Sequence, residues 1–322
     1  MIELVKKIKD RIEKMESERQ RIADEVRGME KIMPEFLESK FVKAIEPKEF
    51  SGKVAAVDGG ILDRSYYGID VYVVRSAGVI YDYERGELKR VEYVPSRNPE
   101  HKVIDKYELD ENESRWAKSI IRLKEEVSRA AEINADIVIM DGSIFPLPSD
   151  IPAKDSQVYP EYEELAGAYK GMFKGMKRKG ALLLGISKDS RSAKMAGKFK
   201  IRGSDVLFAD KLLKAGERSA VMEMKWPNEN EKGYFMYVKV SEEDMPLRVE
   251  FLEHRMSFDE IAGIVHWLSG INKKYTYPAV LIEADLTARL HEVEIERIER
   301  EIMFGTGSLR KFRRERRPFG GS

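Results

Sequence analysis

Two acidic residues in this chain each end a short apolar run and precede a glycine. Asp58 ends the run KVAAVD and Asp141 ends the run DIVIMD. Side chains at strand ends converge in open α/β sheets, so two such acids on neighbouring strands would lie close together. Each acid taken alone also fits a turn-capping role. A close pair of carboxylates needs a cation, and oxygen ligands of this kind favour Mg²⁺ or Mn²⁺.

A third carboxylate is expected from the helix that precedes Asp141. Glu125 and Glu126 are both candidates. Glu126 lies beside the apolar stripe formed by Leu123, Val127 and Ala130, so it is expected nearer the sheet. A solvated glutamate on the helix surface is the alternative for either residue.

Two more residues complete the candidate set. Asp285 follows the apolar run at 280–282, and Lys188 comes two residues after the apolar run ALLLGI at 181–186. A lysine at the same sheet edge would hold a phosphate or orient a water molecule. The four histidines have no metal-ligand spacing and there is no cysteine, so any metal site depends mainly on oxygen ligands.

The elements that must position these residues follow from hydrophobic periodicity. Apolar runs separated by turn signals predict antiparallel strands in the first part of the chain, and strands alternate with helices after it. We therefore expect one α/β domain with a mixed sheet. The expected strands are 53–58, 69–76, 78–83, 87–94, 136–141, 181–186, 220–226, 234–240 and 248–251, and the expected helices are 113–133, 161–179, 258–269 and 286–303.

The first 33 residues form a separate pattern. Their apolar residues recur every three or four positions, with Arg19 as the polar exception, which predicts an amphipathic helix that packs on its own domain or on a partner. We divide the chain into a helical arm at 1–45, an α/β domain at 46–304 and a basic tail at 305–322. The apolar positions of the arm are Val5, Ile8, Ile12, Met15, Ile22, Val26 and Met29.

Composition excludes several classes of protein. The chain of 322 residues has no cysteine, so a disulfide scaffold and a cysteine nucleophile are excluded. It has no secretory signal and no long apolar stretch, so we expect a soluble cytoplasmic protein that does not cross a membrane. Charged residues make up 35% of the chain in equal numbers of each sign, a surface typical of thermophile proteins.

The zero net charge conceals two basic segments. Residues 170–218 contain fourteen Lys and Arg against four acids, a net charge of +10, and residues 309–317 have a net charge of +5. Both are candidates for binding phosphates, although a solvated surface explains either one equally well. Phe199, Phe208 and Phe312 lie among these cations and would permit base stacking.

These segments, in this order, resemble the NurA nuclease family. The matching parts are 54–60, the helix that ends near Glu126, 137–143, 182–188, 248–250 and 277–290. The resemblance implies an RNase H-like core and cleavage of single- and double-stranded DNA, with 5′→3′ end resection in recombination repair. It also implies a hexameric HerA-type translocase as partner, and we expect a homodimer that docks on it.

The resemblance carries roles to individual residues. Asp58, Glu126 and Asp141 would hold the catalytic metals, Lys188 would match the lysine of the third motif, and Asp285 stands where many relatives have histidine. Aspartate is a good ligand for Mn²⁺ or Mg²⁺, so aspartate in place of histidine changes the type of ligand and preserves the metal site. Two ions about 4 Å apart would then support phosphodiester hydrolysis.

Two other functions compete with the nuclease hypothesis. An actin-like or sugar-kinase-like ATPase also has Asp-Gly turns after strands, but no Gly-rich adenosine motif is present in the C-terminal third of the sequence. The sequence also contains neither a P-loop nor a GxGxxG motif, so P-loop ATPases and Rossmann folds have no support. A non-catalytic assembly module would use helices 1–33 and 286–303 for a partner and would not need the acids.

Overall fold

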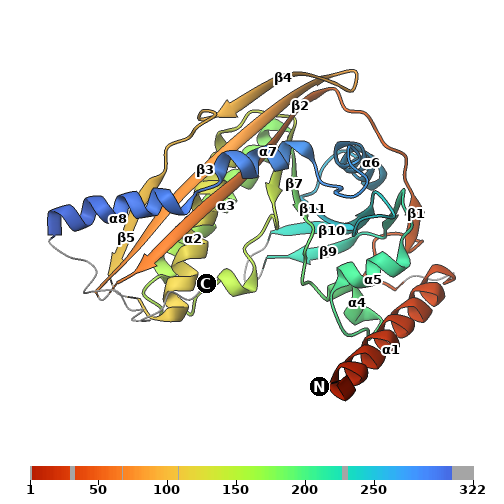
Figure 1. Ribbon diagram of the computed structural model, residues 1–322. Helices are drawn as coiled ribbons and strands as arrows, with labels where there is room; N and C mark the ends of the chain where they lie inside the picture. The colour runs from red at the N-terminus through yellow and green to blue at the C-terminus, as the bar shows by residue number, and fades with distance from the viewer. Residues whose placement is uncertain (1, 30–32, 67, 108, 227–230, 307–322) are drawn as a thin grey trace.

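The computed structural model describes residues 2–29, 33–66, 68–107, 109–226 and 231–306 (Figure 1). Its centre is one large mixed sheet with helices packed on both faces. A long N-terminal helix lies at one end of the molecule (Figure 1). This confirms the expected mixed α/β fold with a helical arm.

Five strands form the part of the sheet that carries the candidate acids. Their order is β4-β3-β2-β6-β7, in which β2, β6 and β7 are parallel and β3 is antiparallel to both β2 and β4. The strands are β2 (Gly52–Ser65), β3 (Ile69–Glu84), β4 (Glu87–Val94), β6 (Ile137–Asp141) and β7 (Leu182–Ser187).

The first hairpin differs from the expectation. The two strands expected at 69–76 and 78–83 are one strand, β3, and β2 continues seven residues beyond Asp58. The reason is that β2 and β3 pair without a break from Gly52 opposite Tyr83 to Ser65 opposite Asp70. Glycines that suggest turns in the sequence lie inside this ladder.

Beyond β7 the sheet continues through antiparallel strands. The order β7-β11-β10-β8-β1 forms this second part, and two further strands pair at the side, β9 with β10 and β5 with β3. The strands are β1 (Val42–Ala44), β5 (Lys102–Tyr107), β8 (Glu217–Ser219), β9 (Met222–Lys225), β10 (Lys232–Lys239) and β11 (Leu247–Phe251).

Helices bury both faces of the sheet. One core includes apolar residues of α1 to α5, and the other includes those of α6 and α7. Capping boxes at Asp110 and Ser257 define the starts of α2 and α6. The helices are α1 (Ile2–Arg27), α2 (Glu111–Glu132), α3 (Tyr159–Lys179), α4 (Lys194–Lys198), α5 (Asp205–Leu212), α6 (Phe258–Ser269), α7 (Ala279–Ala288) and α8 (Glu292–Thr306), with a 3-10 turn at Pro148–Asp150.

The helix expected at 286–303 is two helices. α7 ends at Ala288, Arg289 leaves the helical conformation with φ −57° and ψ 129°, and α8 begins after His291. The new helix is capped locally, because the backbone N–H of His291 donates to the Glu294 carboxylate at 2.9 Å. Within the described ranges, no helix is long and apolar enough to span a membrane.

The N-terminal helix α1 is covered over only half its length. Ala23 and Val26 are fully buried, and Arg27 donates to the backbone carbonyl of Leu212 in α5 at 2.6 Å. The apolar residues of the first turns remain exposed: Leu4, Val5, Ile8, Ile12 and Met15. The expected amphipathic helix is therefore present, but only its C-terminal half packs on the domain.

Candidate functional site

Asp141 lies at the end of β6 and points to solvent. Gly142 follows with a φ of 98°, a left-handed conformation that favours glycine, so the expected strand-to-turn transition is present. The Tyr277 hydroxyl donates to Asp141 Oδ1 at 2.5 Å and also lies 3.0 Å from the Ile186 carbonyl oxygen. Asp141 is thus held by a buried tyrosine from the segment before α7.

Asp58 lies beside Asp141, but not at a strand end as the sequence suggested. Val57 pairs with Met140, so the next position of the register places Asp58 level with Asp141 on the adjacent parallel strand. Alternation puts both acids on the sheet face that α6 and α7 cover. Asp58 is 7% exposed, and its Oδ1 accepts a 2.7 Å hydrogen bond from the Gly59 N–H.

The two glycines after Asp58 permit helices to approach the strand closely. A Cβ at Gly59 would lie 2.8 Å from Cγ and Oε1 of Glu126 in α2. A Cβ at Gly60 would lie 2.4 Å from the backbone oxygen of Ala288, the last residue of α7. Their role is therefore to admit α2 on one face and α7 on the other, rather than to turn the chain.

The structure distinguishes the two candidate glutamates of α2. Glu126 is 2% exposed, lies against Gly59 and accepts a 2.7 Å charged hydrogen bond from Arg122 one helical turn earlier. Glu125 points away and forms an ion pair with Lys102 at 2.7 Å. Glu126 is thus the glutamate that reaches the candidate site, around the end of β6.

Electrostatics show that these acids act on one another. Burial raises the pKa of Asp58 to about 6, with further contributions from the charges of Asp141 and Asp285. Burial raises the pKa of Glu126 to about 8, the charges of Asp58 and Asp141 add to this, and Arg122 opposes it. Crowded carboxylates with raised pKa values retain protons that a bound cation would displace.

Asp285 lies inside α7, not before a helix as expected. Its side chain is half exposed and accepts a 2.8 Å hydrogen bond from Arg289. Its charge nevertheless contributes to the raised pKa of Asp58. Asp285 therefore adds negative charge near Asp58 from α7, which packs on the same face of the sheet.

Lys188 follows β7 and lies against two tyrosine rings. Its ammonium nitrogen is 3.8 Å from the ring centre of Tyr275 and 4.1 Å from that of Tyr277, and it donates to the Tyr275 hydroxyl. Because Tyr277 also binds Asp141, one side chain connects the lysine with the acid. Neither tyrosine has a sequence signal that indicates this role, because both are far from Asp141 and Lys188 in the sequence.

A buried ionic network holds the loop after Asp141. Glu250 of β11 accepts from the Ser143 hydroxyl at 2.7 Å and from the Ile144 N–H at 3.1 Å. Arg248 donates to Glu250 at 2.7 Å and to the Tyr237 hydroxyl at 2.9 Å. The segment 248–250 thus fixes the turn beside the acids.

The donor chemistry of the site suits a hard divalent cation. Asp58, Glu126, Asp141 and Asp285 supply carboxylate oxygens only. In the described part of the chain, no three acids or histidines are close enough together to enclose a metal ion. Arg122, Tyr277 and Arg289 instead each occupy one carboxylate, so these three contacts would have to rearrange for an ion to be enclosed.

Part of the expected DNA-binding surface is structural. Arg218 is fully buried and pairs with Glu38 and Asp259, so it is not available to phosphates. Phe208 is fully buried, which excludes it from base stacking, and the partly buried Phe199 packs against it with ring centres 5.3 Å apart. The basic tail at 309–317, with Phe312, lies outside the described residues.

Comparison with solved structures identifies the class of fold. The chain is similar to the NurA nuclease from Sulfolobus solfataricus, with 18% identity, a TM-score of 0.61, and coverage of 94% of this chain and 97% of that one. It is also similar to a NurA structure with manganese, at 11% identity and a TM-score of 0.51, covering 93% and 98% of the two chains. A third, NurA bound to dAMP and manganese, has 10% identity, a TM-score of 0.50 and coverage of 78% and 88%.

The family follows from the sequence match. The model of the NurA domain matches residues 52–290, which contain every candidate acid and Lys188. No curated protein matches the chain by sequence. The chain belongs to the NurA family.

Proposed function

We propose that this protein is a metal-dependent DNA nuclease whose site is the group of carboxylates around the end of β6. The observation that carries this proposal is the position of Asp58 beside Asp141, with Glu126 against Gly59 and the pKa values of Asp58 and Glu126 both raised. Membership of the NurA family and the manganese and dAMP in related structures support it.

Asp58, Glu126, Asp141 and Asp285 are the residues that would hold Mn²⁺ or Mg²⁺, two ions in each site. Ions bound there would supply an activated water and stabilise the leaving oxygen of the phosphodiester. Lys188, held against Tyr275 and Tyr277, would bind the phosphate. Tyr277 would orient Asp141 through its hydroxyl.

We further propose that the protein works in the cytoplasm as a homodimer with a HerA-type hexameric translocase. Its activity would combine 5′→3′ exonuclease and single-strand endonuclease cleavage in DNA end resection. The exposed apolar residues at the start of α1 support a partner contact by the arm, residues 1–45. The nuclease domain would occupy 46–304 and the basic tail 305–322.

End-labelled single- and double-stranded DNA, incubated with Mn²⁺ or Mg²⁺, tests the activity. We expect degradation by the wild type and none by Asp58→Ala or Asp141→Ala. Glu126→Ala and Glu125→Ala form a matched pair on one helix, because only Glu126 faces the site. Full activity in Asp58→Ala or Asp141→Ala, or equal losses in the two glutamate variants, would refute the assignment.

A further inference from the structure

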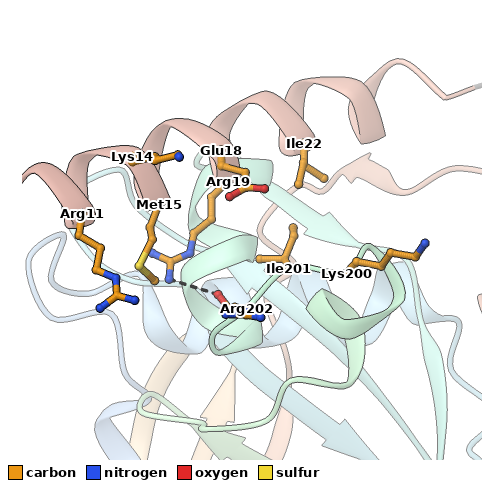
Figure 2. Close-up of a pocket in the computed structure, with 9 residues that line it drawn as sticks. All are labelled: Arg11, Lys14, Met15, Glu18, Arg19, Ile22, Lys200, Ile201 and Arg202. Carbon is orange, nitrogen blue, oxygen red and sulfur yellow. Dashed lines mark hydrogen bonds between the residues drawn. The ribbon is translucent and has the colours of Figure 1, made fainter.

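A basic hollow lies between α1 and the loop at residues 200–202, away from the carboxylates. It encloses about 660 Å³, a volume within the range of about 300–1,000 Å³ that is usual for ligand sites. Figure 2 shows α1 along one side and the loop facing it. Figure 1 places this end of the molecule beside α4 and α5, separated from α7.

The lining carries an excess of positive charge. Five cations and one acid, Glu18, line the hollow, which leaves a net charge of +4. Nothing else in its lining compensates this charge. The five cations are Arg11, Lys14, Arg19, Lys200 and Arg202.

Most of these cations have no acidic partner, unlike their neighbours. Across the described residues, ion pairs are frequent: Lys198 pairs with Glu35 at 2.7 Å, and Lys211 pairs with Glu16 at 3.1 Å. Arg19 also pairs with Glu16. None of the other four cations of the hollow forms an ion pair within the described ranges. Their charge is therefore free for a ligand.

The two walls are fixed relative to each other. Arg19 is 7% exposed and donates across the hollow to the backbone oxygen of Arg202 at 3.4 Å (Figure 2). The loop is anchored beyond this contact, because the buried carboxylate of Asp205 accepts from the Ala196 N–H at 2.8 Å. Preorganised walls lower the cost of binding.

We infer that this hollow is a docking site for the phosphodiester backbone of a single DNA strand. Arginine and lysine side chains recognise phosphate oxygens, and the repeated charge of a strand matches several separate cations. The apolar surface of Met15, Ile22 and Ile201 lines the same hollow and accommodates sugars or bases without base-specific hydrogen bonds. The inference rests on the proposed action on DNA and adds a second contact outside the carboxylate site.

Binding of a fluorescein-labelled thymidine 30-mer, measured by anisotropy in EDTA, tests this site without cleavage. The triple variant Arg11→Ser, Lys200→Ser, Arg202→Ser removes three exposed, unpaired cations. We expect its Kd to rise at least tenfold. The slope of log K against log salt should fall by about 2, because each phosphate contact on a single strand contributes about 0.7.

A matched control removes three cations from other exposed places. Lys7→Ser, Arg21→Ser, Lys89→Ser changes the net charge equally but removes cations that pair with acids. We expect a less than twofold change in Kd. An unchanged Kd in the first variant, or equal increases in both variants, would overturn the site. Urea unfolding curves of both variants check that they fold.

Two further measurements separate the alternatives. Polyglutamate and tripolyphosphate serve as competitors of the labelled DNA strand. If the first triple variant loses polyglutamate binding but retains DNA binding, the partner is an acidic protein and the inference fails. An Asp141→Asn variant should lose cleavage and keep wild-type DNA binding. If the first triple variant binds DNA as tightly as the wild type, and the wild type cleaves DNA, only the docking site is refuted. If the triple variant binds DNA more weakly but the wild type shows no cleavage, the nuclease proposal is refuted.

Discussion

Two regions of this protein bury charged side chains, and they resolve the charge in opposite ways. Arg218 is fully buried, and Glu38 and Asp259 bind it. Burial alone would raise the pKa of Glu38, but the hydrogen bonds from Arg218 and Lys43 lower it below its ordinary value. Asp58 and Glu126 are also buried, yet their pKa values rise to about 6 and about 8.

The two regions differ in whether the protein itself provides a cation in contact with each buried acid. Around Arg218 each acid has a cation in contact, so the cluster is complete and stabilises the second part of the sheet. Around Asp58 the acids face one another, and Arg122 is the cation in contact with Glu126. A buried charge left without full compensation is expected where a ligand completes the site.

The largest expected effect is at the carboxylate site, where one substitution should lower the activity but raise the stability. Asp58→Asn should lower DNA cleavage by roughly a thousandfold, since a metal ligand is lost, and should raise the free energy of unfolding above pH 7. The gain is about 1–3 kcal/mol, because the amide removes a buried charge whose pKa is raised to about 6. Cleavage assays and urea unfolding measure both quantities, and a destabilised Asp58→Asn protein would contradict the comparison.

The same kind of substitution at the compensated cluster should destabilise. Arg218→Met leaves Glu38 without its main cation, so we expect a loss of about 3–5 kcal/mol in the free energy of unfolding. Lys43→Met serves as control, because this half-exposed cation pairs with the same glutamate at 2.8 Å and should cost less. Urea unfolding at pH 7 gives both values; equal losses would mean that burial of the cation is irrelevant.

The raised pKa values predict how stability depends on pH in the absence of divalent metal. Asp58 and Glu126 keep protons in the folded protein that the unfolded chain releases from about pH 4 upward. The free energy of unfolding should therefore fall between pH 4 and pH 8, by about 1–3 kcal/mol for Asp58.

Asp58→Asn/Glu126→Gln provides the comparison for this pH dependence and should show a shallower decline. Mn²⁺ should restore stability at pH 8 and release protons on binding, which calorimetry in two buffers detects. Parallel pH curves for the wild type and the double variant would contradict the assignment.

The smallest effect concerns the contact that orients Asp141. Tyr277→Phe removes the 2.5 Å hydrogen bond but keeps the ring against Lys188, so we expect about a tenfold loss of cleavage and a higher Mn²⁺ requirement. Tyr275→Phe is the control, because it removes a hydroxyl that binds Lys188 and not Asp141. The Mn²⁺ dependence of Tyr275→Phe should equal that of the wild type. A higher Mn²⁺ requirement in both variants would contradict a specific role of Tyr277 in orienting Asp141.

The sequence predicted the elements better than the contacts between them. Apolar stripes and strand runs located α2, α6, β6 and β7 within a few residues, because these signals are local. The prediction that a strand ends at Asp58 was wrong, because β2 continues to Ser65. A glycine that ends a strand and one that admits a neighbouring helix look the same in a sequence, and only the packing of α2 and α7 distinguishes them.

The candidate site shows the same limit. Asp58, Asp141 and Glu126 were found from their positions relative to apolar runs, and the structure places Glu126 rather than Glu125 against β2. Tyr277 was not found, because its contact with Asp141 joins residues more than a hundred positions apart. Counting charges in 170–218 also overstated the free surface, since burial of Arg218 cannot be read from its charge.

The continuous pairing of β2 has a kinetic consequence. Asp58 lies well inside a ladder that runs from Gly52 to Ser65, so fraying at either end of the hairpin does not expose its amide. Hydrogen exchange at this position requires the opening of the whole hairpin. Ligand entry therefore needs no ordering of the backbone around Asp58, and the contacts that have to change are the side-chain hydrogen bonds of Glu126 and Asp141.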